Sequence, residues 1–206
     1  MTKRVVPVAS LVDELKKTEG APITSDRIAE VLTDVTLDEA SLRPYVRFAD
    51  DHYTRNLIHR DAHFDIMVLC WMPGQGTPIH THNGQLGWAF TTRGALECVE
   101  YRWTGCDRPE NQDVSGMDCL AGGMKVKLER TQSAVATPGG PVGRVTRKVT
   151  IHSLAVPHEV TEPTVSLHVY SLPFDSCVVF DVAQGNCRRK ELAFDSAPPG
   201  SAVRMR

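Results

Sequence analysis

The sequence predicts a mainly β fold, a small barrel or sandwich of short strands. From about Tyr53 onward, runs of β-branched, aromatic and aliphatic residues have the length of strands. Gly, Pro and Asn separate these runs, as expected for turns. The expected strands cover residues 64–71, 95–103, 124–129, 144–152, 165–170 and 177–181. Many short strands with turn signals between them are typical of sandwiches and barrels.

The first fifty residues carry helix signals instead. Ser10 and Ser25 stand where they can cap short helices. Thr36 followed by Glu39 has the form of a capping box, and Pro44 marks the end of the helical segment that this box would begin. We therefore expect one domain over residues 1–206. Its parts are a helical segment over about 1–50, a β-barrel over about 53–182 and a loose tail over 195–206.

Composition excludes several functional classes. The chain has 206 residues and a formal net charge of −2, which does not favour binding to nucleic acid or to a membrane surface. No apolar run approaches the ~20 residues that span a bilayer. The six cysteines form no C-x-x-C pair, so we expect free thiols in a cytoplasmic protein. We expect a monomer or a small homo-oligomer with a small-molecule substrate.

The most informative segment contains His80 and His82. On a strand, residues i and i+2 point to the same face, so these two imidazoles can enter one barrel interior and bind a metal. The pair alone is weak evidence, because two ordinary hydrogen-bonded histidines give the same pattern. A third ligand is expected from a later strand. His152, which ends a β-rich run, is favoured over His158, which follows Pro157.

The surrounding glycines strengthen the metal interpretation. Gly74, His80-x-His82, Gly87 and Gly94 are spaced as in the first cupin motif, which this segment resembles. That resemblance implies a cupin-type, jelly-roll-like barrel with the N-terminal helices packed outside. The acidic position of the motif is Gly87 here. A site of neutral histidines keeps the full charge of the metal and favours an anionic ligand such as a thiolate.

A second polar pattern lies on the strand expected at 165–170. Alternation puts Ser166, His168 and Tyr170 on one face, and Val165, Leu167 and Val169 on the other. If the polar face points inward, it needs hydrogen-bond partners, which a Ser–His–Tyr chain supplies to itself. The alternative is an outward polar face over an inward Val/Leu/Val face.

Together these motifs resemble the cysteine dioxygenases, the thiol dioxygenase branch of the cupins, over about residues 53–181. The segments that carry the resemblance are YTRNLI (53–58), LCW (69–71), IHTH (79–82) and TEPTVSLHVYSLPFDSC (161–177). The resemblance implies ferrous iron, Fe(2+), on three histidines, His80, His82 and His152. It also implies that Ser166, His168 and Tyr170 form a hydrogen-bonded relay.

The resemblance further implies that Arg55 binds the substrate carboxylate and that Tyr53 lines its pocket. A planar guanidinium suits two parallel hydrogen bonds to a carboxylate. Animal members cross-link a cysteine to the active-site tyrosine. The matching position here is Gly87, so Tyr170 is expected to be an unmodified phenol, as in bacterial-type members.

The expected function is a dioxygenase that adds both atoms of O2 to the sulfur of a small thiol, with L-cysteine as the leading substrate. One alternative is the same reaction on 3-mercaptopropionate or mercaptosuccinate. Another is a cupin that binds metal or ligand without turnover. A zinc-dependent isomerase or hydrolase is disfavoured, because the metal motif has no carboxylate.

Overall fold

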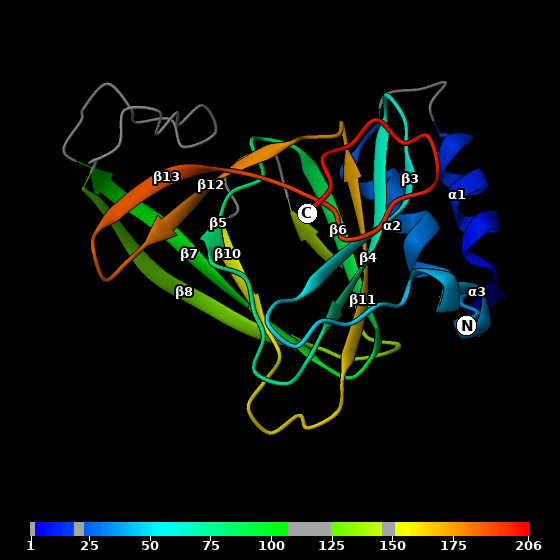
Figure 1. Cartoon of the computed structure of the whole chain (residues 1–206), viewed down its shortest axis with the longest axis horizontal. Helices are drawn as coiled ribbons and strands as arrows, with labels where there is room; N and C mark the ends of the chain where they lie inside the picture. The colour runs from blue at the N-terminus through cyan, green and yellow to red at the C-terminus, as the bar shows by residue number, and fades with distance from the viewer. Residues whose placement is uncertain (1–2, 19–22, 107–124, 146–150) are drawn as a thin grey trace.

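The computed structural model describes residues 3–18, 23–106, 125–145 and 151–206, and it places the helices at the N-terminal end (Figure 1). The helical elements are α1 (Val8–Lys16), α2 (Ser25–Thr33), α3 (Glu39–Leu42) and a 3₁₀ turn (Arg43–Tyr45). Two short strands, β1 (Arg4–Val6) and β2 (Val35–Leu37), pair in parallel beside them. No helix in the described ranges is long and apolar enough to cross a membrane.

The caps of these helices differ from the sequence prediction. Ser10 lies inside α1, whose N-cap is Pro7. The side chain of Thr24, not Ser25, caps α2 by accepting a hydrogen bond from the Arg27 amide. The predicted capping box is wrong because Thr36 belongs to β2, and Asp38 caps α3 instead. For α2 and α3 the shift is small, since Ser, Thr and Asp are all favoured N-cap residues, whereas α1 has no side-chain cap.

The remaining strands form two sheets. The first sheet has six strands in the order β13-β12-β5-β10-β7-β8, and the second has five in the order β3-β4-β11-β6-β9. Figure 1 shows the sheets facing each other, with the helices on the outer side of the five-stranded sheet. Within the described ranges no strand pairing joins the two sheets. The barrel is therefore an open, jelly-roll-like sandwich. The bounds are β3 (Thr54–Arg60), β4 (Phe64–Trp71), β5 (Ile79–His80), β6 (Leu86–Arg93), β7 (Leu96–Cys106), β8 (Val126–Ala136), β9 (Gly143–Val145), β10 (Ile151–Ala155), β11 (Thr164–Ser171), β12 (Ser176–Asp181) and β13 (Asn186–Glu191).

The central strands β4 and β11 are buried on both faces, because the helices cover one face and the opposite sheet covers the other. On β11, Val165, Leu167 and Val169 join the cluster that includes the helix residues Leu11 and Leu15. The alternate residues of β11 point into the space between the sheets. This resolves the ambiguity of the Ser166–Tyr170 pattern: both faces are buried, and the polar face is the inner one.

The C-terminal segment differs from the prediction of a loose tail. Ser196 pairs with Asn56 on β3, and the Leu57 amide donates to the Ser196 carbonyl at 2.8 Å. Phe194, which is 3% exposed, pairs with Met205. Pro and Ser suggested disorder, but the segment buries an aromatic ring and continues the edge of the sheet beside β3. The six-stranded sheet also extends past residue 182, because β13 adds an edge strand.

Candidate active site

Three histidines meet between the sheets. The short strand β5 lies between β10 and β12, which puts His80 directly opposite His152. Gly76 allows this docking, since a Cβ there would lie 2.7 Å from the Leu154 carbonyl oxygen of β10. His82 lies beyond the end of β5, yet its ring still shares the interior, so the expected i, i+2 strand is shorter than predicted. The three ring centroids are 4.7–4.8 Å apart.

The nitrogen atoms of this cluster fit a metal ion. His80 Nδ1 donates to the Pro78 carbonyl at 2.9 Å, which leaves Nε2 as the lone-pair donor. His152 Nδ1 lies 3.6 Å from Cys98 Sγ, and its Nε2 is buried without a partner. Both ring nitrogens of His82 are buried and unpartnered. Buried polar atoms without partners are rare and costly, and one ligand atom from each ring lies within 4.8 Å of the others. A metal ion would satisfy them together.

Burial keeps these imidazoles neutral. It lowers the pKa of His80 to about 4 and holds the pKa values of His82 and His152 well below the usual 6.5. At His82 and His152 the neighbouring rings add to the shift, since a second charge in the cluster would be repelled. Near pH 7 each ring therefore presents a lone pair, the form that binds a metal.

The same shifts predict acid sensitivity of the metal-free protein. Burial lowers the pKa of His168 to about 3, while the unfolded chain titrates near 6.5. Between pH 6.5 and about pH 3, His168 is therefore protonated in the unfolded state but neutral in the folded state. The free energy of unfolding decreases as the pH is lowered through this range. We expect His168 alone to cost roughly 2 kcal/mol between pH 6.5 and 5.

Urea denaturation at pH 7.5 and pH 5 would measure this loss. His168→Gln should show a shallower fall over the same range. A free energy of unfolding that stays constant from pH 7.5 to 5 would contradict the assignment of buried neutral rings.

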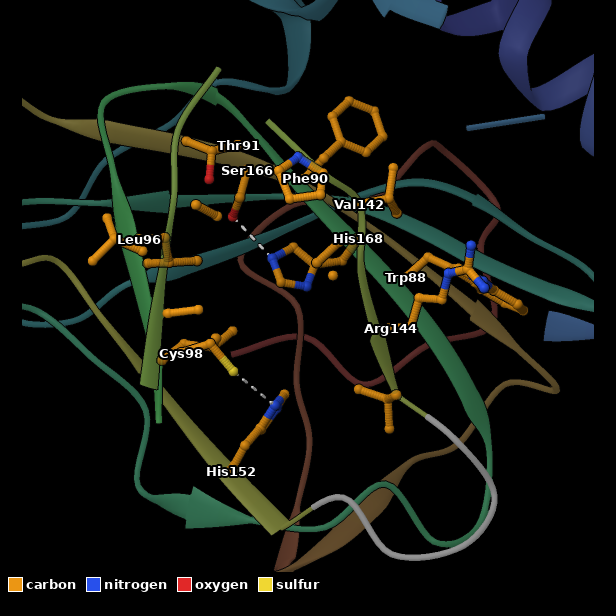
Figure 2. A pocket seen from close by; sticks show the side chains of 18 of the residues that line it. Trp88, Phe90, Thr91, Leu96, Cys98, Val142, Arg144, His152, Ser166 and His168 are labelled. Atoms are coloured by element: carbon orange, nitrogen blue, oxygen red, sulfur yellow. Dashed lines mark hydrogen bonds between the residues drawn. The ribbon is translucent and has the colours of Figure 1, made fainter. Parts of the chain in front are cut away.

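Beside the histidine cluster, the inner face of β11 forms a hydrogen-bonded chain. Trp71 Nε1, which can only donate, donates to Ser166 Oγ at 3.0 Å. Ser166 Oγ lies 2.9 Å from His168 Nε2 and can donate to it, so the neutral imidazole carries its proton on Nδ1. That nitrogen lies 3.4 Å from the Tyr170 hydroxyl oxygen. The phenol hydrogen is then free to point elsewhere. Figure 2 shows the Ser166–His168 bond next to the Cys98–His152 contact.

Tyr170 stands against the histidine cluster. Its ring stacks on His82 with centroids 5.5 Å apart and meets Phe174 edge-on at 5.2 Å. Burial raises the pKa of Tyr170, so it remains a neutral phenol. Gly87 lies opposite Tyr170 in the β6–β11 ladder, and a Cβ there would come within 3.0 Å of the ring. The position that holds the cross-linking cysteine in animal members is thus adjacent to the Tyr170 ring. In this chain the position is Gly87, which has no side chain.

A small pocket on the Arg55 side of the cluster is lined by both predicted substrate residues. Tyr53 stacks on Trp71 with centroids 4.6 Å apart. Arg55 is 7% exposed, and its Nε has no hydrogen-bond partner. Its guanidinium lies over the Phe194 ring at 5.1 Å. A buried cation with an unsatisfied donor is suited to an anionic ligand. The complete lining is Tyr53, Arg55, Thr77, Pro78, His80, His82, Tyr170, Phe174, Cys177, Val179, Lys190 and Leu192.

Not every predicted residue joins the site. His158 is exposed in the turn after Pro157 and is not part of the histidine cluster. Cys70, Cys98 and Cys177 are free thiols, but Cys187 is disulfide-bonded, so the expectation of free thiols fails there. Sequence reasoning also missed Lys190, which lies opposite Cys177 on β13 and lines the pocket. The sequence of strand β13, NCRRKE, is rich in charged residues and does not indicate a strand that lines a buried site.

Two facing sheets around an inward cluster of three imidazoles define a metal-capable cupin. The family model for cysteine dioxygenase type I matches residues 2–183, and the chain belongs to this family. It is therefore an oxygenase of the thiol dioxygenase class, which confirms the resemblance read from the motifs.

Two mammalian members of the family are similar to this chain. Human (Homo sapiens) cysteine dioxygenase type 1 is 28% identical over 178 residues, which cover 86% of this chain and 80% of the human protein. The rat (Rattus norvegicus) enzyme is 29% identical over 181 residues, with the same coverage. Among solved structures, a protein with a double-stranded β-helix domain from Klebsiella pneumoniae covers 68% of this chain and 95% of its own, at 17% identity and a TM-score of 0.39.

Proposed function

We propose that this protein is an iron-dependent dioxygenase that converts a small thiol carboxylate, L-cysteine in the first place, to its sulfinate. The observation that carries the proposal is the meeting of three neutral, largely unpartnered imidazoles with a buried, unsatisfied Arg55. The reaction adds both atoms of O2 to one thiol, RSH + O2 giving RSO2H, which is the sulfinic step of thiol oxidation. His80, His82 and His152 are the proposed metal ligands.

The choice of metal follows from the reaction. Imidazoles accept zinc, copper, nickel or iron, but zinc has no redox chemistry. Oxidation of sulfur by O2 needs a redox-active centre, which excludes zinc, and among the remaining ions Fe(2+) is proposed because the resemblance to the cysteine dioxygenases implies it. Ferrous iron bound at these rings would supply the acidity that converts the thiol to thiolate and the electrons that activate O2.

The chain's own residues hold and orient the substrate. Arg55 would bind the carboxylate through two parallel hydrogen bonds, which fixes the sulfur beside the histidine cluster. The hydroxyl hydrogen of Tyr170 would point at the reacting sulfur or oxygen, because His168 Nδ1 donates to the phenol oxygen and leaves that hydrogen free. Ser166 and Trp71 fix the tautomer of His168. Phe174 and the stacked Tyr53–Trp71 pair help to exclude water from this side.

Lys190 supports a second candidate substrate. It lines the same pocket as Arg55. Burial is the main cause of the low pKa of His80 and of the raised pKa of Cys177, and the charge of Lys190 adds to the first shift and opposes the second. A thiol with two carboxylates, such as mercaptosuccinate, would pair with both cations. L-cysteine has a single carboxylate and would use Arg55 alone.

The proposal is tested by loading the protein with Fe(2+) without air and then supplying O2 with L-cysteine, 3-mercaptopropionate or mercaptosuccinate in separate reactions. Sulfinate from L-cysteine, equal to the O2 consumed, is the expected result. Preference for mercaptosuccinate would select the second candidate. Iron binding with no oxygen uptake on any thiol would overturn the proposed function in favour of a non-catalytic cupin.

Tyr170→Phe tests the role of the phenol. The ring keeps its contacts with His82 and Phe174, so iron content should be unchanged. Loss of one positioned donor is expected to lower kcat about 100-fold and to make O2 consumption exceed sulfinate formed. Tyr101→Phe, on β7 outside the pocket, is the matched control. Normal coupled turnover by Tyr170→Phe would contradict the role.

Lys190→Gln tests the second cation. If it binds a second carboxylate, KM for mercaptosuccinate should rise about tenfold, which corresponds to ~1.4 kcal/mol. KM for L-cysteine should stay the same. Steady-state kinetics with both thiols distinguishes this from a general defect, which would raise the two KM values together.

A further inference from the structure

A second cavity, of about 190 Å³, lies behind the Ser166–His168–Tyr170 chain (Figure 2). Its walls include Leu96 on β7, Ala136 at the end of β8, Phe90 on β6, Val142 and Leu154. These are apolar side chains from both sheets. At its inner end the cavity reaches His152, His168 and Tyr170.

This cavity and the Arg55 pocket approach the histidine cluster from different sides. Among the described residues, Tyr170 alone lines both spaces. The cluster itself is divided, since His80 and His82 line the Arg55 pocket and His152 lines the apolar cavity. An ion held by the three rings would therefore sit at the partition between the two spaces.

The chemistry of the cavity excludes a thiol carboxylate. Its two charged residues already have partners: Arg144 is paired with Asp26 at 2.8 Å, and Glu100 accepts a hydrogen bond from Gln132 at 2.8 Å. Arg144 is thus already paired, and Glu100 would repel a second carboxylate. A carboxylate placed there would lose hydration without gaining a cationic partner.

Polar partners for water are confined to one part of the lining, at Thr91 and around His152 and Tyr170, while Phe90, Leu96, Val142 and Leu154 offer none. Thr91 Oγ1 is buried without a partner, while Ser166 Oγ is already bonded to Trp71 and His168. Apolar cavities of roughly 150 Å³ bind benzene or xenon, so the apolar part of this space can take a small apolar molecule. A small apolar molecule is the occupant that this lining fits.

We propose that this cavity holds dioxygen and delivers it to the metal site by a path separate from that of the thiol. The inference rests on the proposed function, which requires O2 at the site while a thiol fills the Arg55 pocket. An apolar diatomic molecule would partition to the apolar side chains of the cavity and reach the cluster on the His152 side. The thiol would enter where Arg55 lies.

The first test measures occupancy without turnover. In the full chain loaded with zinc, which is redox-inert and diamagnetic, methyl NMR signals are followed under xenon and then under O2. The Leu96 and Leu154 methyls should shift with xenon and broaden with O2. Those of Leu15, fully buried in the helix-side cluster, should respond far less. Equal responses at all three residues would overturn the proposal.

The second test uses cavity-filling variants of the iron-loaded protein. Ala136→Phe and Val142→Phe should raise KM for O2 about fivefold or more, leave KM for the thiol unchanged and abolish the xenon shifts. Ser133→Phe, on the same strand β8 but outside the cavity, is the control. An unchanged KM for O2 in both filled variants would overturn delivery by this path. Absence of sulfinate from the unaltered protein with every thiol would instead overturn the proposed function, and the xenon response would show separately whether the cavity binds gas.

Discussion

Removing the His152 imidazole is expected to strip the metal from the protein and to abolish sulfinate formation. His152→Ala takes away one of only three candidate donors in the described cluster. Losing a group that merely hydrogen-bonds a ligand typically costs about 10–100-fold in metal affinity, so losing a ligand itself should cost more. Metal content after dialysis, together with O2 consumption, measures both effects.

His158→Ala is the matched control, since this histidine is six residues away and exposed. It should retain iron and activity. The fold of His152→Ala should survive, because the variant removes a buried nitrogen that has no partner in the metal-free protein. Iron loss in His158→Ala, with iron retained in His152→Ala, would contradict the proposed ligand set.

The fold could be predicted where burial dictates the sequence. Strands β4 and β11 stand out because both of their faces are covered and their residues are β-favouring. Strand β13 could not be found this way. It is an edge strand with the sequence NCRRKE, and its pairing with β12 depends on contacts that no local pattern records. The order of the C-terminal segment could not be predicted either, because Ser196 pairs with Asn56, which is distant in the sequence.

The site divides along similar lines. His80 and His82 follow from spacing, and Arg55 follows from the family motif. Lys190 and Cys98 could not be predicted, because their roles depend on cross-strand neighbours: Lys190 lies opposite Cys177, and Cys98 Sγ lies 3.6 Å from His152 Nδ1. The apolar cavity is harder still to predict from the sequence, since its lining comes from both sheets and from the 137–143 turn.

Arg55→Gln is expected to lower kcat/KM for L-cysteine about 100-fold or more, equivalent to ~2.7 kcal/mol, because the carboxylate loses a charged, two-pronged partner. Arg55→Lys should rescue little, since an ammonium cannot form two parallel hydrogen bonds in one plane. Cysteamine, the same thiol without a carboxylate, supplies the decisive comparison. The preference for L-cysteine over cysteamine should collapse in Arg55→Gln, whereas a purely structural defect would slow both thiols equally.

Arg60 provides a control on the same strand. Its guanidinium also lies over Phe194, at 5.6 Å, but it is paired with Asp65, which is 1% exposed, and with Asp175. Arg60→Gln would leave the buried Asp65 carboxylate uncompensated, which typically costs about 3–5 kcal/mol of stability, yet KM should not change. Arg55→Gln should show the reverse, a raised KM with a smaller loss of Tm, because Arg55 Nε has no partner to lose and the guanidinium gives up its contact with Phe194 but no buried ion pair. A loss of Tm in both variants with unchanged KM would mean that Arg55, like Arg60, serves the fold and that another group binds the carboxylate.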